Sequence, residues 1–191
     1  AMYVGNPIAH NYSAQIYLRP LMEILQTERF FSAGTVDQHP QQMGSFALYG
    51  QEWFFPVPDI DHTDLLICMG ANPIVSQGSL MSAPNVKARI DAMQARGGKL
   101  VVIDPRFTET SEAADQHIFI RPGTDALLLL SWVNELFATN GVRPGHLADC
   151  IDDIDWIRAI AAQYPADVTM QITGVDADVL RKLVHAYANT E

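Results

Sequence analysis

The sequence Lys-Leu-Val-Val-Ile-Asp-Pro-Arg, residues 99–106, decides the fold of this chain. Residues 100–103 form a continuous aliphatic run rich in β-branched side chains, a pattern typical of a strand buried on both faces in a parallel sheet. A glycine pair at 97–98 precedes the run, and Pro105, which cannot continue a central strand, follows it. Asp104 is therefore expected where the strand ends and the chain turns.

The position of Asp104 allows two interpretations. Ligands of open parallel sheets bind beyond the carboxyl ends of the strands, and a carboxylate there can accept hydrogen bonds from both hydroxyls of a ribose. The alternative is an Asx turn that only closes the end of the strand. The sequence on either side of this strand is needed to choose between a ligand contact and a turn.

The flanking sequence predicts an α/β fold. Buried strands are expected at residues 64–69 and 117–121, and a helix over 84–96 with Pro84 in its first turn. A strand, a helix and a second strand in this order predict a right-handed parallel crossover. A helix over 125–139 is apolar nearly all round and is expected to be deeply buried. We expect a Rossmann-like parallel sheet with helices on both faces.

The last part of the chain differs in character. Helices are predicted over 152–164 and 176–189, joined by residues 165–174, where no strand is expected. The predicted organisation is a Rossmann-like dinucleotide-binding domain over residues 1–148 and a C-terminal helical appendage, residues 149–191, packed on it.

Composition narrows the function. The formal charge of −10 over 191 residues argues against a nucleic-acid partner, because phosphate backbones require a basic surface. No apolar run reaches the length of a membrane span. Cys68 and Cys150 do not have the spacing of metal ligands and are expected to be unpaired. Residues 3–7 read like the tail of a strand, which indicates a fragment of a longer protein of undetermined compartment.

Three loops that follow the predicted strands carry groups suited to a nucleotide. Gly70 lets the backbone approach a phosphate, and Asn72 and Ser76 add neutral donors. Asp104 suits a ribose. Asp125, at the start of a helix, can accept hydrogen bonds from the N1 and N2 edge of guanine, which adenine does not offer.

Two arginines, Arg106 and Arg121, are available in these loops for a pyrophosphate. Each loop also has a structural explanation, since Asp125 can serve as an N-cap and the glycines can be turn residues. Their joint occurrence at three successive strand ends favours a nucleotide site. No G-x-G-x-x-G follows a strand, which counts against a standard NAD or FAD site.

The ordered set of motifs resembles a known family. Gly-Ala-Asn-Pro at 70–73, Arg-Gly-Gly-Lys-Leu-Val-Val-Ile-Asp-Pro-Arg-Phe-Thr-Glu-Thr at 96–110 and Ala-Asp-Gln-His-Ile-Phe-Ile-Arg-Pro-Gly-Thr-Asp at 114–125 resemble molybdopterin oxidoreductases of the dimethyl sulfoxide reductase type. The resemblance implies that this is the central domain that holds the guanosine and pyrophosphate end of a bis(molybdopterin guanine dinucleotide) cofactor. The implied cofactor contacts are Gly70, Ala71, Asn72 and Ser76 in the first loop, Asp104, Arg106 and Thr108 at the ribose and phosphates, and Gly123, Thr124 and Asp125 at the guanine.

The resemblance also implies what lies outside these motifs. The parent would be a molybdenum-dependent oxidoreductase with an iron–sulfur cluster on upstream residues and an electron-transfer subunit as a possible partner. The other domains of the same parent chain are the expected partners of this one. A molybdenum ligand is expected in residues 37–44, where the best-matching position holds Met43, with Ser45 two residues on and no thiolate, so the ligand and the substrate remain open. The fragment alone is expected to retain no cofactor and to have no turnover.

Two other functions remain open from the residues. A nucleotide-binding α/β domain of another kind, such as the middle domain of thiamine-diphosphate enzymes, also places acids at strand ends. A non-catalytic interaction domain could have kept the fold and lost the ligand. A preference for guanine over adenine would distinguish a molybdopterin guanine dinucleotide domain from the thiamine-diphosphate type of domain. The absence of any bound nucleotide would favour the interaction domain.

Overall fold

The computed structural model describes residues 1–5, 8, 11–78 and 83–190. The chain divides into two compact units, Ala1–Val57 and Pro58–Glu191. The second unit contains both the central sheet and the helices that follow residue 149. The expected boundary between residues 148 and 149 stays a prediction.

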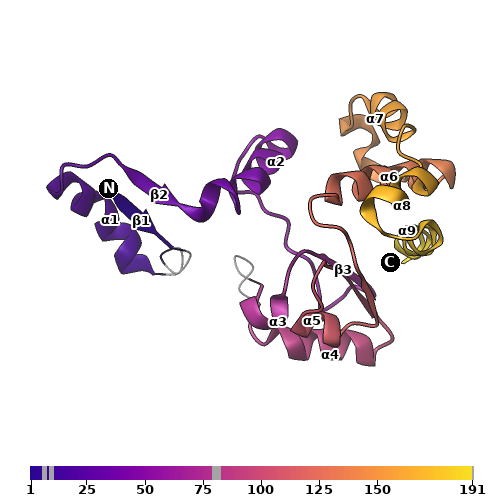
Figure 1. Cartoon of the computed structure of the whole chain (residues 1–191), viewed down its shortest axis with the longest axis horizontal. Helices are drawn as coiled ribbons and strands as arrows, with labels where there is room; N and C mark the ends of the chain where they lie inside the picture. Colours follow the sequence, from indigo (N-terminus) through magenta and orange to yellow (C-terminus); the bar gives the residue numbers. More distant parts are fainter. Residues whose placement is uncertain (6–7, 9–10, 79–82, 191) are drawn as a thin grey trace. The chain divides into compact units, whose positions relative to one another are not determined.

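The first unit is built on a pair of short parallel strands (Figure 1). Its elements are β1 (Met2–Val4), α1 (Tyr12–Ile24), β2 (Phe30–Ser32), the 3-10 turn η2 (Ala33–Thr35) and α2 (His39–Tyr49). Asn11 caps α1, since its side-chain oxygen accepts a hydrogen bond of 2.9 Å from the Ala14 N–H. The strand expected at residues 3–7 is present as β1 up to Val4, and residues 6–7 lie outside the described part of the chain.

The second unit is organised around the parallel sheet that the sequence predicts. β3 (Leu65–Met69), β4 (Lys99–Ile103) and β5 (Gln116–Ile118) pair in that order, with β4 in the centre. β5 ends three residues earlier than expected. Beyond it the Arg121 N–H donates to the carbonyl of Thr173 at 2.8 Å, because the chain has left the sheet to meet a C-terminal helix.

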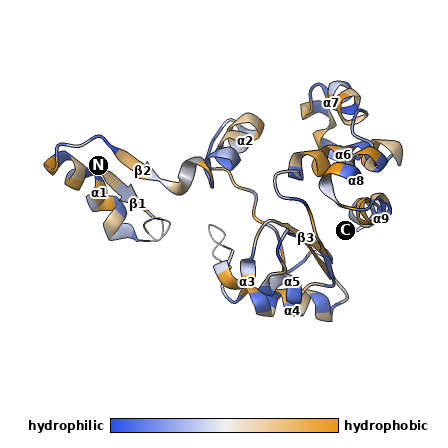
Figure 2. Ribbon diagram, in the orientation of Figure 1, coloured by the Kyte–Doolittle hydropathy of each residue, from blue (hydrophilic) through white to orange (hydrophobic). Residues whose placement is uncertain are grey.

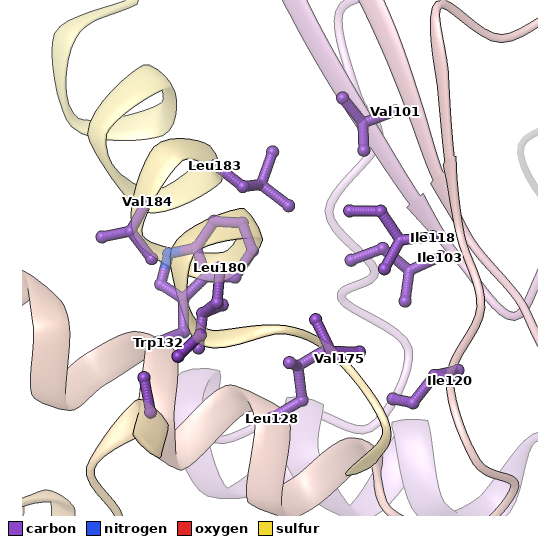
Figure 3. Close-up of a cluster of buried hydrophobic side chains, with 12 residues drawn as sticks. Val101, Ile103, Ile118, Ile120, Leu128, Trp132, Val175, Leu180, Leu183 and Val184 are labelled. Carbon is purple, nitrogen blue, oxygen red and sulfur yellow. The ribbon is translucent and has the colours of Figure 1, made fainter. Parts of the chain in front are cut away.

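Helices cover both faces of this sheet, as expected. Successive residues of β4 alternate between two apolar clusters, with Val101 and Ile103 on one face and Leu100 and Val102 on the other. Figure 3 shows the first cluster, in which side chains from α6 and α9 meet the sheet. Each fully buried side chain of this size contributes about 1.5–3 kcal/mol to stability, so β4 anchors both layers.

The helices of the second unit and its 3-10 turn η4 have these bounds: α3 (Pro73–Ser76), α4 (Val86–Ala95), α5 (Glu109–Glu112), α6 (Asp125–Ala138), η4 (Gly145–Cys150), α7 (Ile154–Ala161), α8 (Ala166–Thr173) and α9 (Ala177–Asn189). In Figure 1, α3, α4 and α5 lie on one side of the sheet and α6, α8 and α9 on the other. The C-terminal helices therefore pack on the sheet, as the sequence indicates. Among the described residues, no helix combines the length and apolarity that spanning a bilayer requires.

Three details differ from the sequence predictions. The helix expected from Pro84 begins at Val86, after Asn85 takes a left-handed conformation with φ of 51°. Residues 165–174, predicted only as a segment that joins two helices and contains no strand, contain the helix α8. The prediction of deep burial for α6 is wrong, because Leu129 is 47% exposed. Figure 2 shows hydrophobic colouring along α6, but only one side of the helix faces the cluster with the sheet.

Candidate functional site

The three loops singled out in the sequence all follow the carboxyl ends of neighbouring parallel strands. Residues 70–76 follow β3, residues 104–108 follow β4, and residues 121–125 come after β5. Because parallel strands end at the same side of a sheet, the loops share one edge, which we call the carboxyl edge. The topology therefore brings Asn72, Asp104 and the segment that carries Asp125 to one side of the sheet.

The first loop begins with an exposed glycine. Gly70 has φ of 59°, a conformation that favours glycine, and a Cβ added there would meet nothing within 4 Å. Its N–H donates to the Ile103 carbonyl at 2.9 Å, which fixes the start of the loop against the end of β4. Ala71 is exposed beside it, and Ser76 is exposed at the end of α3. The backbone of this loop is open to an approaching group.

Asn72 joins the first loop to the second. Its Nδ2 donates to Glu109 Oε2 at 2.7 Å. Its Oδ1 accepts hydrogen bonds from the Thr110 hydroxyl at 2.7 Å and from the Thr110 N–H at 3.2 Å. The sequence suggested Asn72 as a donor to a ligand, and in this structure its side chain holds two loops together.

Asp104 is buried, with 8% of its surface exposed, and its carboxylate is partly engaged. Oδ1 accepts a hydrogen bond of 2.8 Å from the Arg106 N–H, which is the Asx turn considered from the sequence. Within the described residues, this is the only hydrogen bond found for the carboxylate. The turn and a ligand contact are therefore compatible, because the turn uses one oxygen and Oδ2 is left with no protein partner there.

The other residues of the second loop divide into an exposed and a buried group. Arg106 is exposed on the carboxyl edge, and no ion pair is found for it in the described part of the chain. Thr108 is 5% exposed and caps α5, since its hydroxyl accepts a hydrogen bond of 3.1 Å from the Ser111 N–H. Arg106 can therefore meet an anion directly, whereas Thr108 shapes the loop.

The third loop orders the start of α6. Gly123 has φ of 77° and is open on its Cβ side. Thr124 is 8% exposed and occupies the N-cap position, and its hydroxyl donates to the Arg121 carbonyl at 2.7 Å. Asp125 is the first helical residue and is exposed, with no hydrogen bond to its carboxylate among the described residues. The alternative that Asp125 is the N-cap is therefore wrong, because Thr124 holds that position.

Two groups at the carboxyl edge have shifted pKa values. Burial raises the pKa of the Cys68 thiol, which donates to the Ala71 carbonyl at 3.3 Å, and the nearby Asp104 carboxylate raises it further. The hydrogen bond from Asn72 lowers the pKa of Glu109, and the charge of Arg106 adds to this effect. At neutral pH the thiol is neutral and Glu109 is ionised, so both hydrogen bonds are in place.

Three residues that support the edge were not identified from the sequence. Thr110 and Glu109 hold Asn72, and His117 Nε2 lies 3.0 Å from the carbonyl oxygen of Asp104. The His117 ring also meets Phe119 edge to face, with ring centroids 4.3 Å apart. These contacts join residues that are distant in sequence, so a local pattern does not predict them. The one local feature that marks this segment is Thr108, a residue type typical of a helix N-cap, which caps α5.

The segment expected to supply a molybdenum ligand lies on α2 in the first unit. Met43 is 68% exposed there. Ser45 is buried, and its hydroxyl lies 2.6 Å from the Phe54 carbonyl, to which it donates. Among the described residues, no group of three or more His, Cys, Asp or Glu side chains is placed to hold a metal ion, and Cys68 and Cys150 are free thiols.

The carboxyl edge offers hydrogen-bonding and charged groups of the kinds that nucleotides bind. A buried carboxylate with one oxygen available matches a ribose diol, an exposed guanidinium matches a phosphate, and an exposed carboxylate matches the N1 and N2 donors of guanine. These are Asp104, Arg106 and Asp125, with Gly70 and Gly123 leaving the backbone open beside them.

Curated relatives match most of this chain. The alpha subunit of an F420-dependent formate dehydrogenase from Methanocaldococcus jannaschii is 24% identical over 184 residues, which cover 95% of this chain and 26% of that protein. Formate dehydrogenase H from Escherichia coli is 29% identical over 135 residues, covering 71% of this chain and 18% of the relative. The chain thus spans about a quarter or less of the length of these relatives.

A solved structure and a family profile complete the comparison. Acetylene hydratase from Pelobacter acetylenicus superposes with a TM-score of 0.71 and 25% identity, covering 90% of this chain and 23% of that one. The profile of the molybdopterin oxidoreductases matches residues 7–142, well over half of the chain, including all three loops. This match decides against the middle domain of thiamine-diphosphate enzymes, and the chain belongs to the molybdopterin oxidoreductase family.

Proposed function

We propose that this chain is the cofactor-binding domain of a molybdenum-dependent oxidoreductase and that it holds the guanosine and pyrophosphate end of a molybdopterin guanine dinucleotide. The observation that carries the proposal is the carboxyl edge itself. Three loops at the ends of adjacent parallel strands present two carboxylates, Asp104 and Asp125, and the exposed Arg106. The family match makes a pterin dinucleotide the ligand class to consider first.

Each group has a defined role in this proposal. Asp104 Oδ2 accepts the ribose hydroxyls while Oδ1 keeps the turn closed through the Arg106 N–H. The Arg106 guanidinium and the backbone at Gly70 meet the pyrophosphate. Asp125 accepts from guanine N1 and N2, and Gly123 and Thr124 shape its loop. Ala71, Asn72, Ser76 and Thr108 remain proposed cofactor-lining residues, of which Asn72 and Thr108 act through the loops that they hold.

The chemistry of the parent enzyme follows from its cofactor. When bound, the molybdenum–pterin group supplies a two-electron redox centre, and this domain binds and orients its nucleotide tail. We infer that the chain is one domain of a longer protein, with an iron–sulfur cluster on upstream residues and an electron-transfer subunit as a partner. By itself the domain is expected to retain no cofactor and to catalyse no turnover.

The test measures guanine in the full-length protein that contains this chain. Acid hydrolysis of the dinucleotide releases GMP, which chromatography separates from AMP and quantifies per mole of protein. The proposal predicts GMP in the wild-type protein, and Asp104→Asn and Asp125→Asn should each lower the retained amount. An unpaired buried polar group costs about 1–3 kcal/mol, so the association constant should fall about fivefold to about 150-fold.

Asp152→Asn is the matched control, because Asp152 is an exposed carboxylate between η4 and α7 and belongs to none of the three loops of the carboxyl edge. The control should retain GMP at the wild-type level. AMP in place of GMP would refute the guanine assignment. The absence of any nucleotide from the wild-type protein would favour a domain that kept the fold and lost the ligand.

A further inference from the structure

Two very short helices at the carboxyl edge depend on each other. α3 and α5 have four residues each, and helices of this length have no independent stability in water. They lie side by side on one face of the sheet (Figure 1) and are in contact. Their stability must therefore come from tertiary interactions.

The two helices cap each other reciprocally. The Thr110 hydroxyl, on α5, accepts a hydrogen bond of 3.2 Å from the Ile74 N–H, which belongs to the unsatisfied first turn of α3. The Asn72 Oδ1, at the N-cap position of α3, accepts a hydrogen bond of 3.2 Å from the Thr110 N–H in the first turn of α5. The Thr110 hydroxyl closes the arrangement by donating to Asn72 Oδ1 at 2.7 Å.

Thr110 is the centre of this arrangement and is inaccessible to a ligand. Its exposed fraction is 0%, whereas Asp104, in the loop just before it, keeps 8% of its surface exposed. Gly70 fixes only the start of the first loop, through its bond to the Ile103 carbonyl, and Thr110 fixes the end of that loop. The spacing between the first and second loops is thus set from both ends.

We propose that Thr110 is a positioning residue for nucleotide binding, which holds the Gly70 loop at the distance from the Asp104 loop that one ligand spanning both requires. The inference rests on the proposed function, because it concerns the same edge. When a loop spends part of its time out of place, the apparent affinity falls by the fraction of competent molecules. Loss of the Thr110 hydroxyl therefore weakens ligand retention although Thr110 touches no ligand.

The test compares the rates at which full-length variants lose guanine nucleotide. Each purified protein is held at a fixed temperature, desalted at intervals and hydrolysed in acid, and the remaining GMP is measured relative to its starting value. Thr110→Val keeps the size of the side chain and removes both hydroxyl hydrogen bonds, so GMP loss should be about tenfold faster. Thr110→Ser keeps the hydroxyl and should stay within about twofold of the wild-type rate.

Thr169→Val is the matched control, since Thr169 is 2% exposed and, in the part of the chain that the structure describes, its hydroxyl bonds only to the carbonyls of Pro165 and Ala166. It should lower thermal stability and leave the rate of GMP loss unchanged. If Thr110→Val fails to fold, Thr110→Cys, a weaker donor of similar size, should show a smaller acceleration in the same direction.

The outcomes separate the two proposals. A wild-type protein that contains no guanine nucleotide would overturn the proposed function, and this inference with it. A wild-type protein that contains GMP, together with equal loss rates for Thr110→Val and Thr169→Val, would overturn the inference alone. A serine variant as defective as the valine variant would also overturn it, because the hydroxyl would not be the cause.

Discussion

Asp115 should make this fold sensitive to acid. Desolvation raises the pKa of this carboxyl, but hydrogen bonds from Gln94, the Lys99 ammonium and the Leu100 N–H outweigh it and hold the pKa at about 2, against an ordinary value of 3.8. The three bonds measure 2.9, 2.8 and 2.9 Å. They tie the segment before β5 to α4 and to the start of β4.

The size and sign of the effect follow from this difference in pKa. A fall from 3.8 to about 2 corresponds to about 2.4 kcal/mol at about 1.36 kcal/mol per pH unit. The Asp115 side chain is 25% exposed and solvent screens its charge, so about 1–2 kcal/mol is the realistic contribution. Because the pKa is lowered in the folded state, this contribution is present above pH 3.8 and is lost as the pH falls towards 2.

The assay is urea unfolding of the chain and of Asp115→Asn between pH 7 and pH 3. At pH 7 the variant should have a free energy of unfolding about 1–2 kcal/mol lower, and at pH 3 about half of that difference should remain. Asp91→Asn, which breaks an exposed pair with Lys87, should differ from wild type by less than about 0.5 kcal/mol. A wild-type–variant difference that stays constant over this pH range would refute the linkage.

Four further substitutions test the core, the third loop and two glycines. Leu100→Ala removes a side chain with 0% exposure and should lower the free energy of unfolding by about 2–5 kcal/mol in urea titration; a loss below 1 kcal/mol would contradict the packing of this face. Asp125→Asn should change the free energy of unfolding by less than about 1 kcal/mol, since only its charge at the first turn of α6 contributes; a larger loss would show a structural role. Gly98→Ala should destabilise by about 1–3 kcal/mol, because the new Cβ would lie 2.9 Å from the Met93 carbonyl oxygen. Gly44→Ala, in the interior of α2 where a Cβ meets nothing within 4 Å, should instead stabilise the protein by about 0.5–1 kcal/mol. Calorimetric melting measures both glycine variants, and a higher melting temperature for Gly98→Ala or a lower one for Gly44→Ala would contradict these predictions.

The retained guanine and the stability measurements answer different questions. The free energy of unfolding measures how strongly the apolar layers and the hydrogen bonds of Asp115 hold the second unit together. The amount of GMP retained measures ligand binding at the carboxyl edge, where Asp104, Asp125 and Thr110 are expected to act. A variant that changes only the free energy of unfolding identifies a residue that stabilises the fold. A variant that changes only the retention of GMP identifies a residue that contributes to ligand binding.

The sequence by itself determined the central sheet. Residues 100–103 are aliphatic without alternation, and the only environment that buries both faces of such a strand is the middle of a sheet covered on two sides. The strand–helix–strand order then requires parallel neighbours, so the carboxyl edge and its acidic residues could be predicted from local pattern alone. Asp104 and Asp125 were identified in this way, because strand ends and helix starts are local features.

Only the tertiary structure decided features that depend on partners distant in sequence. α8 was missed because packing against α6 and α9, rather than its own pattern, holds this short helix. The apolar pattern of α6 predicted burial, but how much of a helix is covered depends on which elements surround it, and Leu129 stays exposed.

The same limit applies to the loops of the site. Thr124 and not Asp125 became the N-cap of α6, a choice made by the backbone turn at Gly123. Asn72 and Thr110 are 38 residues apart in the chain, and their hydrogen bond exists because the sheet brings the ends of β3 and β4 together. Local sequence places polar groups at strand ends, and the fold decides which of them stay open at the carboxyl edge and which bond to one another.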